Sequence, residues 1–324
     1  MEIVVHHWDA DGVSSAAILM RERGRMPVFT PPVGEFKFDP RIESGVYSSK
    51  LAYFVDLNMP GDVFRLAERG LLRKAYFIDH HIQEPISHDR IIYHNPLSRG
   101  EVYPSASFVV SELFNHSSYL TVLGAVGDVG ERLFEMERFG ELAEKILEEE
   151  GVGVEEVLEA VRLVDSNYIT LDRYGVEEAA LFLSEAELDD VLERVEWIEK
   201  AKEVKEDIER AVNSARVNGG VAFVSFYSPN AIISKVAREL VWSGKASVCV
   251  AVNRGFNGKY QLYVRLNRGD KRCRELIESL RKLGINAGGK EEVVGSVFEA
   301  DEERLERALE EVRRIFGFEV ELAE

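Results

Sequence analysis

The sequence predicts an α/β fold with a mostly parallel sheet in an N-terminal domain, a helical connector and a smaller α/β C-terminal domain. Short, almost wholly apolar segments alternate with helical patterns early in the chain, which is typical of parallel strands buried on both faces. Apolar residues three and four apart among many Glu and Lys then indicate helices, and strand patterns return near Gly219. The length of 324 residues suits two domains. We expect their limits at residues 1–190, 191–218 for the connector, and 219–324.

The first domain is expected to start with a buried strand at residues 3–5 and to continue, after Gly12, into a helix at residues 14–20. Asp62 is a suitable N-cap for a helix at residues 63–69. The other expected elements of this domain are strands at 26–30, 51–58, 75–78 and 91–94, and a helix at 105–114.

From about residue 139 to residue 217 the chain is expected to be helical, with its clearest helices at residues 146–164 and 191–212. The tryptophans Trp197 and Trp242 are expected in cores. The expected elements of the C-terminal domain are strands at 221–226, 247–253 and 259–266, helices at 231–241, 273–283 and 302–316, and a glycine-bearing turn at 285–296.

Composition excludes some classes of protein. The net charge of −18, from 58 acidic and 40 basic residues, does not suit a protein that binds long duplex DNA along a basic face. The sequence has neither an apolar run long enough to cross a bilayer nor a signal-peptide pattern. We therefore expect a cytoplasmic protein without a membrane partner. Cys249 and Cys273 are expected to be buried, reduced thiols.

Acidic and histidine side chains follow several of the apolar runs. The carboxyl ends of parallel strands share one edge of a sheet, where open α/β folds bind their ligands. Side chains alternate along a strand, which favours His7 over His6 as a partner of Asp9 and Asp11. An alternative is that Asp9 and Asp11 only form a turn and a helix N-cap. The candidate residues are His7, Asp9, Asp11, Asp56, Asp79, His80, His81 and Asp128.

The chemistry of this set favours a metal site. Clustered carboxylates repel one another unless cations neutralise them. Carboxylate and imidazole ligands together suit Mn²⁺ or a similar ion. Two such ions, roughly 3.5–4 Å apart, would be positioned to activate water against a phosphoryl group, with one carboxylate bridging them.

Four segments resemble the motifs of the DHH phosphoesterase superfamily in their order and spacing. They are HxDxDG at residues 7–12, VDLN at 55–58, DHH at 79–81 and GxxGDxG at 124–130. The Gly-Gly segment near Gly288 is similar to the associated C-terminal domain of that superfamily. The resemblance covers nearly the whole chain. The two-domain length of the chain is most similar to the nanoRNase and pAp-phosphatase branch of the superfamily, and RecJ-type exonucleases are the next most similar.

The resemblance implies a role for each candidate. His7, Asp9 and Asp56 would hold a first Mn²⁺, and Mg²⁺ is the alternative ion. Asp56 would bridge to a second ion, which Asp11, His80 and Asp128 would also bind. Asp79 would orient a histidine from behind the metals. His81 would contact the scissile phosphate.

The C-terminal match is less complete. Relatives usually show GGGH, whereas this chain has Ala287-Gly288-Gly289-Lys290. Lys290 can still neutralise a phosphate as a point charge, so Gly288, Gly289 and Lys290 are expected to bind substrate. Arg265 lies where the superfamily often has a substrate-binding arginine, and the alternative is an exposed strand residue.

The resemblance implies an Mn-dependent phosphodiesterase or exonuclease that cuts short single-stranded oligonucleotides to mononucleotides. Alternatives are a pAp phosphatase, a cyclic-dinucleotide phosphodiesterase, and a non-catalytic nucleic-acid-binding protein like the replication-factor relatives of RecJ. An inorganic pyrophosphatase of the same superfamily is a weaker alternative, because its C-terminal domain lacks the Gly-Gly segment. The expected partner is a short oligonucleotide or small nucleotide, and a homodimer is compatible with the sequence.

Overall fold

The computed structural model describes residues 1–317. The chain divides into two compact units, Met1–Ala201 and Lys202–Glu324, and the division lies inside α10 (Val195–Asn213). The limits of 190 and 218 expected for a separate connector stay a prediction. In the described part of the chain, no helix combines the length and the apolar character that a membrane span requires.

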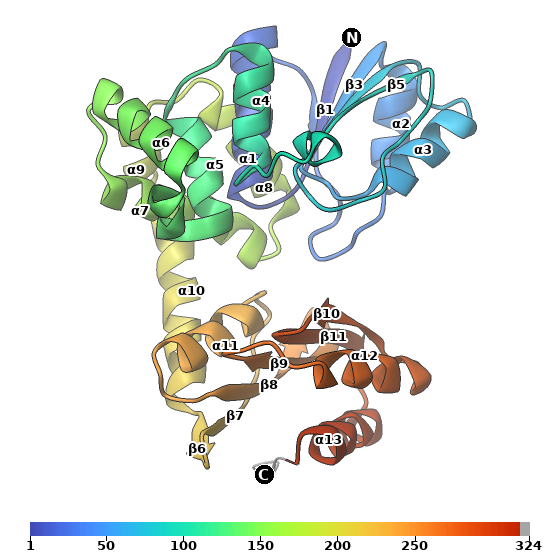
Figure 1. Ribbon diagram of the computed structural model, residues 1–324, viewed down its shortest axis with the longest axis vertical. Helices are drawn as coiled ribbons and strands as arrows, with labels where there is room; N and C mark the ends of the chain where they lie inside the picture. Colours follow the sequence, from blue (N-terminus) through green and yellow to red (C-terminus); the bar gives the residue numbers. More distant parts are fainter. Residues whose placement is uncertain (318–324) are drawn as a thin grey trace. The chain divides into compact units, whose positions relative to one another are not determined.

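A five-stranded sheet forms the centre of the first unit, in the order β2-β1-β3-β4-β5, and every neighbouring pair is parallel. The strands are β1 (Glu2–His6), β2 (Val28–Phe29), β3 (Leu51–Val55), β4 (Ala75–Ile78) and β5 (Ile91–His94). The expected α/β fold with a parallel sheet is confirmed. Helices cover both faces (Figure 1), which explains why successive strand residues are all apolar.

Alternate residues of the strands enter two different cores. Val4 and Tyr53 face the larger core, whereas Val5 and Phe54 face a smaller one. The smaller core is covered by α2 (Pro40–Ser48) and α3 (Pro60–Glu68). The larger one is covered by α1 (Ala10–Arg23), α4 (Ala106–Phe114), α5 (Tyr119–Val129), α6 (Glu137–Glu150), α7 (Val154–Ile169), α8 (Arg173–Leu183) and α9 (Leu188–Leu192).

Two long helices expected from the sequence are each interrupted. The helix expected at 146–164 is wrong as a single element, because α6 ends at Glu150 and Gly151 adopts a left-handed conformation with φ 69°. That conformation satisfies the last carbonyl groups of α6 and redirects the chain. The helix expected at 191–212 is likewise divided between α9 and α10. Short 3₁₀ segments, η1 (Pro96–Arg99) and η2 (Gly130–Glu135), complete this unit.

The second unit contains a six-stranded sheet in the order β10-β11-β9-β8-β7-β6, in which only β7 and β8 are parallel. One face packs on α12 (Arg272–Lys282) and α13 (Glu302–Phe316), and α11 (Ile233–Trp242) packs on β8 and β9. The strands are β6 (Arg216–Asn218), β7 (Val221–Phe226), β8 (Val248–Phe256), β9 (Lys259–Leu266), β10 (Asn286–Lys290) and β11 (Val293–Glu299).

The glycine-bearing turn expected at 285–296 is instead the hairpin of β10 and β11. Gly289 has φ 152°, and a side chain there would collide with the Val293 carbonyl. Glycine is therefore needed for close strand approach at this edge of the sheet, and not for a turn.

Candidate metal centre

The first candidate residues lie where β1 gives way to α1. The strand ends at His6, so strand alternation does not explain how Asp9 and Asp11 come together. Asp9 is the N-cap of α1, because its Oδ1 accepts a hydrogen bond from the Gly12 amide at 3.2 Å. Its other oxygen lies 2.8 Å from His7 Nδ1. Asp9 thus fulfils both alternatives considered for it, a helix cap and a member of the cluster.

Asp11 is held in place by the start of another helix. It is fully buried in the first turn of α1. Its two oxygens accept hydrogen bonds from the Ala106 amide at 2.6 Å and the Ser107 amide at 2.8 Å. These amides begin α4, where the helix dipole favours a negative charge. The carboxylate is therefore fixed before any ligand arrives.

Asp56 lies at the centre of the cluster. It follows β3 in a left-handed conformation with φ 59°, which is uncommon outside glycine. Its side chain is 1% exposed, and neither carboxylate oxygen has a hydrogen-bond partner. His7 Nδ1 lies 3.7 Å from one oxygen, and His80 Nε2 lies 3.5 Å from the other. A buried carboxylate without hydrogen bonds is unfavourable unless a cation compensates it.

Asp79 is also buried, but its oxygens are fully used. Oδ1 accepts from the amides of His80 at 2.7 Å and His81 at 3.0 Å and contacts His81 Nδ1 at 2.7 Å. Oδ2 accepts from the Asn58 amide at 2.8 Å. Burial would raise the pKa of Asp79, but the hydrogen bond from His81 holds it below its ordinary value. This geometry suits a residue that orients His81 and the turn after β3.

Asp128 reaches the cluster from a helix and not from a strand end. It lies near the end of α5, with its Oδ2 3.1 Å from His80 Nε2. Gly124 and Gly127 let α5 pack closely, because a Cβ at Gly127 would lie 2.9 Å from the Cβ of Ala10. The glycines of the GxxGDxG segment therefore have a packing role.

The eight candidate side chains converge in three overlapping groups whose ligand atoms lie within 4.8 Å of one another. The groups are His7, Asp9 and Asp56; Asp11, His80 and Asp128; and Asp56, Asp79, His80 and His81. Asp56 is thus shared between two groups.

His6 is not a member of these groups. It is fully buried, its Nδ1 lies 2.6 Å from the His7 carbonyl, and burial lowers its pKa to about 4.

The electrostatics of the cluster fit a cation site. Burial and the neighbouring Asp128 charge raise the pKa of Asp11 to about 7. Burial and the charges of Asp11 and Asp9 raise the pKa of Asp56 well above its ordinary value. Burial alone would lower the pKa of His80, but Asp128 and Asp56 raise it to about 12. The acids therefore repel one another and compete for positive charge, which divalent ions supply.

Some contacts at this site have no signal in the sequence. The Ala106 and Ser107 amides contact Asp11 across 95 and 96 positions of the chain. Phe36, which is 61% exposed, has its ring centroid 6.0 Å from that of His7. Backbone donors and loop aromatics carry no motif, so only the folded chain reveals them.

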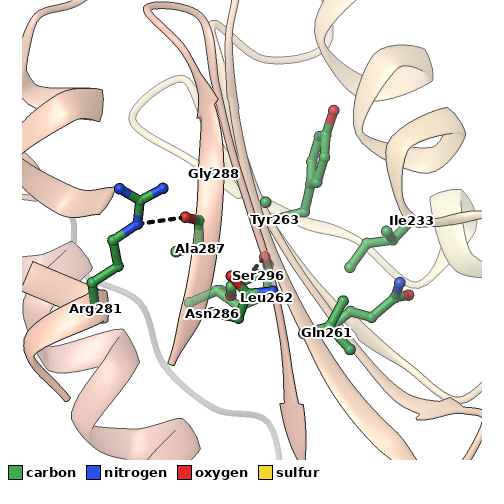
Figure 2. Close-up of a pocket in the computed structure, with 11 residues that line it drawn as sticks. Ile233, Gln261, Leu262, Tyr263, Arg281, Asn286, Ala287, Gly288 and Ser296 are labelled. Atoms are coloured by element: carbon green, nitrogen blue, oxygen red, sulfur yellow. Dashed lines mark hydrogen bonds between the residues drawn. The ribbon is translucent and has the colours of Figure 1, made fainter. Parts of the chain in front are cut away.

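The predicted substrate residues lie in the second unit. Gly288 lines a hollow of about 440 Å³ together with Gln261, Tyr263 and Gly295 (Figure 2). Gly289 and Lys290 follow in β10 and are exposed, without lining this hollow.

Arg265 lies elsewhere on β9, with its guanidinium carbon 4.8 Å from the ring centroid of Trp242. Trp197 is buried as expected, but the core position expected for Trp242 is wrong because it is 63% exposed. Trp242 is the last residue of α11, on the side away from its buried residues.

No protein-family model matches the chain, and no curated protein is similar to it in sequence. Solved structures do share its fold. The exonuclease RecJ bound to manganese is 17% identical, with a TM-score of 0.68 over 98% of this chain and 90% of that chain. A DHH-domain structure described as a member of a family of ribosomal proteins is 16% identical, with a TM-score of 0.67 over 96% and 86%.

The pGpG-specific phosphodiesterase PggH from Vibrio cholerae is 14% identical, with a TM-score of 0.54 over 98% of this chain and 99% of that chain. The chain therefore shares the fold of these DHH-domain structures, including a C-terminal domain. The expected resemblance is confirmed for the fold.

Proposed function

We propose that this chain is a metal-dependent phosphodiesterase that cuts short single-stranded oligonucleotides to mononucleotides. The observation that supports the proposal is Asp56, a buried carboxylate without a hydrogen bond that is shared by two groups of side chains able to hold a metal ion. The similarity of fold to RecJ and PggH supports a reaction at a phosphodiester bond.

The proposed ligand sets combine the motif resemblance with the distances between side chains in the cluster. His7, Asp9 and Asp56 would hold one ion. Asp56 would also take part in holding a second ion, together with Asp11, His80 and Asp128. Two Mn²⁺ or Mg²⁺ ions held by these residues would lower the pKa of a water and neutralise charge on the phosphoryl group.

The remaining side chains have distinct proposed roles. His81 is partly exposed, and its Nδ1 contacts Asp79, so its Nε2 is free to face solvent. We assign it to contact the scissile phosphate through that nitrogen. Asp79 fixes the His81 ring and its tautomer. In the second unit, the hollow beside Gly288 and the cationic groups of Arg265 and Lys290 are proposed to bind phosphates or bases of the substrate.

The test uses the full chain with Mn²⁺ or Mg²⁺. Labelled RNA and DNA of two to five nucleotides, pAp, cyclic di-AMP and pyrophosphate are compared as substrates. We expect mononucleotides from the oligomers, and turnover of pyrophosphate alone or of none of these would contradict the proposal. Turnover of pAp or cyclic di-AMP in preference to oligomers would replace the proposed substrate by that alternative.

Two substitutions separate the site from the fold. Asp56→Asn keeps the size and the tolerated left-handed conformation of residue 56. We expect a loss of activity of more than about 100-fold, because a shared ligand supports several kcal/mol of charge stabilisation. Asp89→Asn is the matched control, since Asp89 is an exposed acid of the same unit. It should retain full activity, and equal activity of the two variants would reject the proposed centre.

A further inference from the structure

Trp242 is an unusual surface residue. It ends α11 with 63% of its surface exposed, and two guanidinium groups lie against its ring. The guanidinium carbon of Arg265 is 4.8 Å from the ring centroid, and that of Arg238 is 5.4 Å away. Arg238 lies one helical turn before Trp242, whereas Arg265 comes from β9. Two separate elements thus place cations around one exposed indole.

Among residues 1–317, these two cations have no acidic partner. Other arginines of the second unit, such as Arg254 and Arg272, form ion pairs with a carboxylate, as expected for a chain with a net charge of −18. Within residues 1–317, neither Arg238 nor Arg265 has a carboxylate oxygen within 4.0 Å. Arg265 Nε is buried and has no hydrogen-bond partner. Their charge is thus available to an anion that the described residues do not supply.

The register of the sheet extends this positive surface. Arg265 pairs with Val293, and Val293 pairs with Lys290, so the three residues form one row on the same face. Strands are about 4.8 Å apart, which puts Lys290 roughly 10 Å from Arg265 along the sheet. Tyr263, two residues before Arg265 on the same face, lines the hollow beside Gly288 (Figure 2). Arg265 and the hollow are thus neighbours on one face of the sheet.

We propose that Trp242, Arg238 and Arg265 form a platform that binds one nucleotide unit of single-stranded nucleic acid. The indole stacks on a base, and the guanidinium groups bind the adjoining phosphate. Stacking on an aromatic ring accepts any base, and guanidinium groups match phosphate geometry. An exposed ring flanked by two cations suits this ligand better than a protein partner or a lipid.

This inference rests on the proposed function, because it names a binding site for the same class of substrate. The test therefore measures binding without turnover. Full-length protein in EDTA is titrated with a labelled adenosine pentanucleotide, an abasic deoxyribose-phosphate pentamer and inorganic tripolyphosphate. Anisotropy reports binding, and tryptophan fluorescence reports stacking.

We expect the pentanucleotide to bind and to quench tryptophan fluorescence. Trp242→Ala should weaken its binding by about 5- to 150-fold, the range for one stacked base. The abasic pentamer should bind more weakly and be insensitive to this substitution. Arg238→Gln should weaken both pentamers and reduce the slope of log affinity against log salt by about 0.7.

The matched control is Arg274→Gln. Arg274 is an exposed arginine of α12, the helix on the opposite face of the sheet. Its variant should bind like the unmodified chain. Because Arg238, Trp242 and Arg274 are exposed, we expect each variant to have the melting temperature of the unmodified chain, and this measurement checks that the variants are folded.

Three outcomes would overturn the platform. They are unchanged binding by Trp242→Ala, equal affinity for abasic and base-bearing pentamers, and an equal effect of Arg274→Gln. Failure of the proposed function is a separate result, namely normal binding in EDTA with no hydrolysis after Mn²⁺ is added. Hydrolysis that proceeds with unchanged KM in Trp242→Ala would retain the proposed function and reject the platform.

Discussion

The substitution Asp79→Asn tests whether Asp79 positions His81 and the turn that carries Asp56. The Asp79 carboxylate makes four contacts with N–H groups, three at Oδ1 and one at Oδ2. An amide has only one acceptor oxygen. Whichever way it is oriented, its NH₂ group must face at least one backbone N–H that Asp79 had satisfied. If the oxygen keeps the three contacts at Oδ1, the unsatisfied donor is the Asn58 amide.

The magnitude follows from these contacts. A buried donor without a partner lowers the free energy of unfolding by about 1–3 kcal/mol. Asn58 is itself left-handed with φ 48°, so the hydrogen bond that its backbone N–H donates to Asp79 helps hold the turn that carries Asp56. The His81 ring also loses its charge-assisted partner. We therefore expect kcat/KM to fall by about 10- to 100-fold, as for other residues that orient ligands.

The assays are urea unfolding in EDTA and kcat/KM with a dinucleotide in Mn²⁺. Asp89→Asn again serves as the control. The reasoning is refuted if Asp79→Asn unfolds at the same urea concentration as the control and keeps its kcat/KM within about 2-fold. A large loss of stability with normal kcat/KM would assign Asp79 to the fold alone.

Three further outcomes are expected. Because the pKa of Asp56 is raised in the folded chain, the charge of this carboxylate opposes folding above pH 3.8. Asp56→Asn should therefore raise the melting temperature measured in EDTA. The same substitution should abolish the further rise in melting temperature that Mn²⁺ gives the unmodified chain. Burial would raise the pKa of Asp172, but the hydrogen bond from Lys200 lowers it. The pair therefore stabilises the fold above about pH 4, and this stabilisation is lost as the pH falls. Urea unfolding of Asp172→Asn should depend less on pH than that of the unmodified chain in this range. Gly127→Leu places its Cβ 2.9 Å from that of Ala10 and should lower the free energy of unfolding by about 1–3 kcal/mol in urea melts.

The sequence predicts the parallel sheet and its approximate strands because apolar runs between helical patterns are a strong and local signal. It also predicts which polar residues lie near one another, since strand ends share an edge. The role of Asp9 shows the limit of this reasoning. The same residue satisfies the rules for a helix cap and for a ligand, and sequence alone offers the two as alternatives.

Other features depend on contacts between distant segments. Asp128 is delivered by a helix whose glycines allow close packing, so a rule about strand ends does not reach it. Trp242 has an apolar ring, which favours a core position, but α11 ends there with that ring outside. The glycines at 288 and 289 satisfy both a turn and a close strand pair, and only the partner strand distinguishes the two.

The clamping of Asp11 by the first amides of α4 has a consequence for local motion. The proposed ligands come from the junction of β1 and α1, from the turns after β3 and β4, and from α5, and α4 is joined to them through Asp11. Chelation would thus remove a cross-link common to five segments that are remote in the chain. Their backbone amides should then gain hydrogen-exchange rate in concert, while those of the second unit keep theirs.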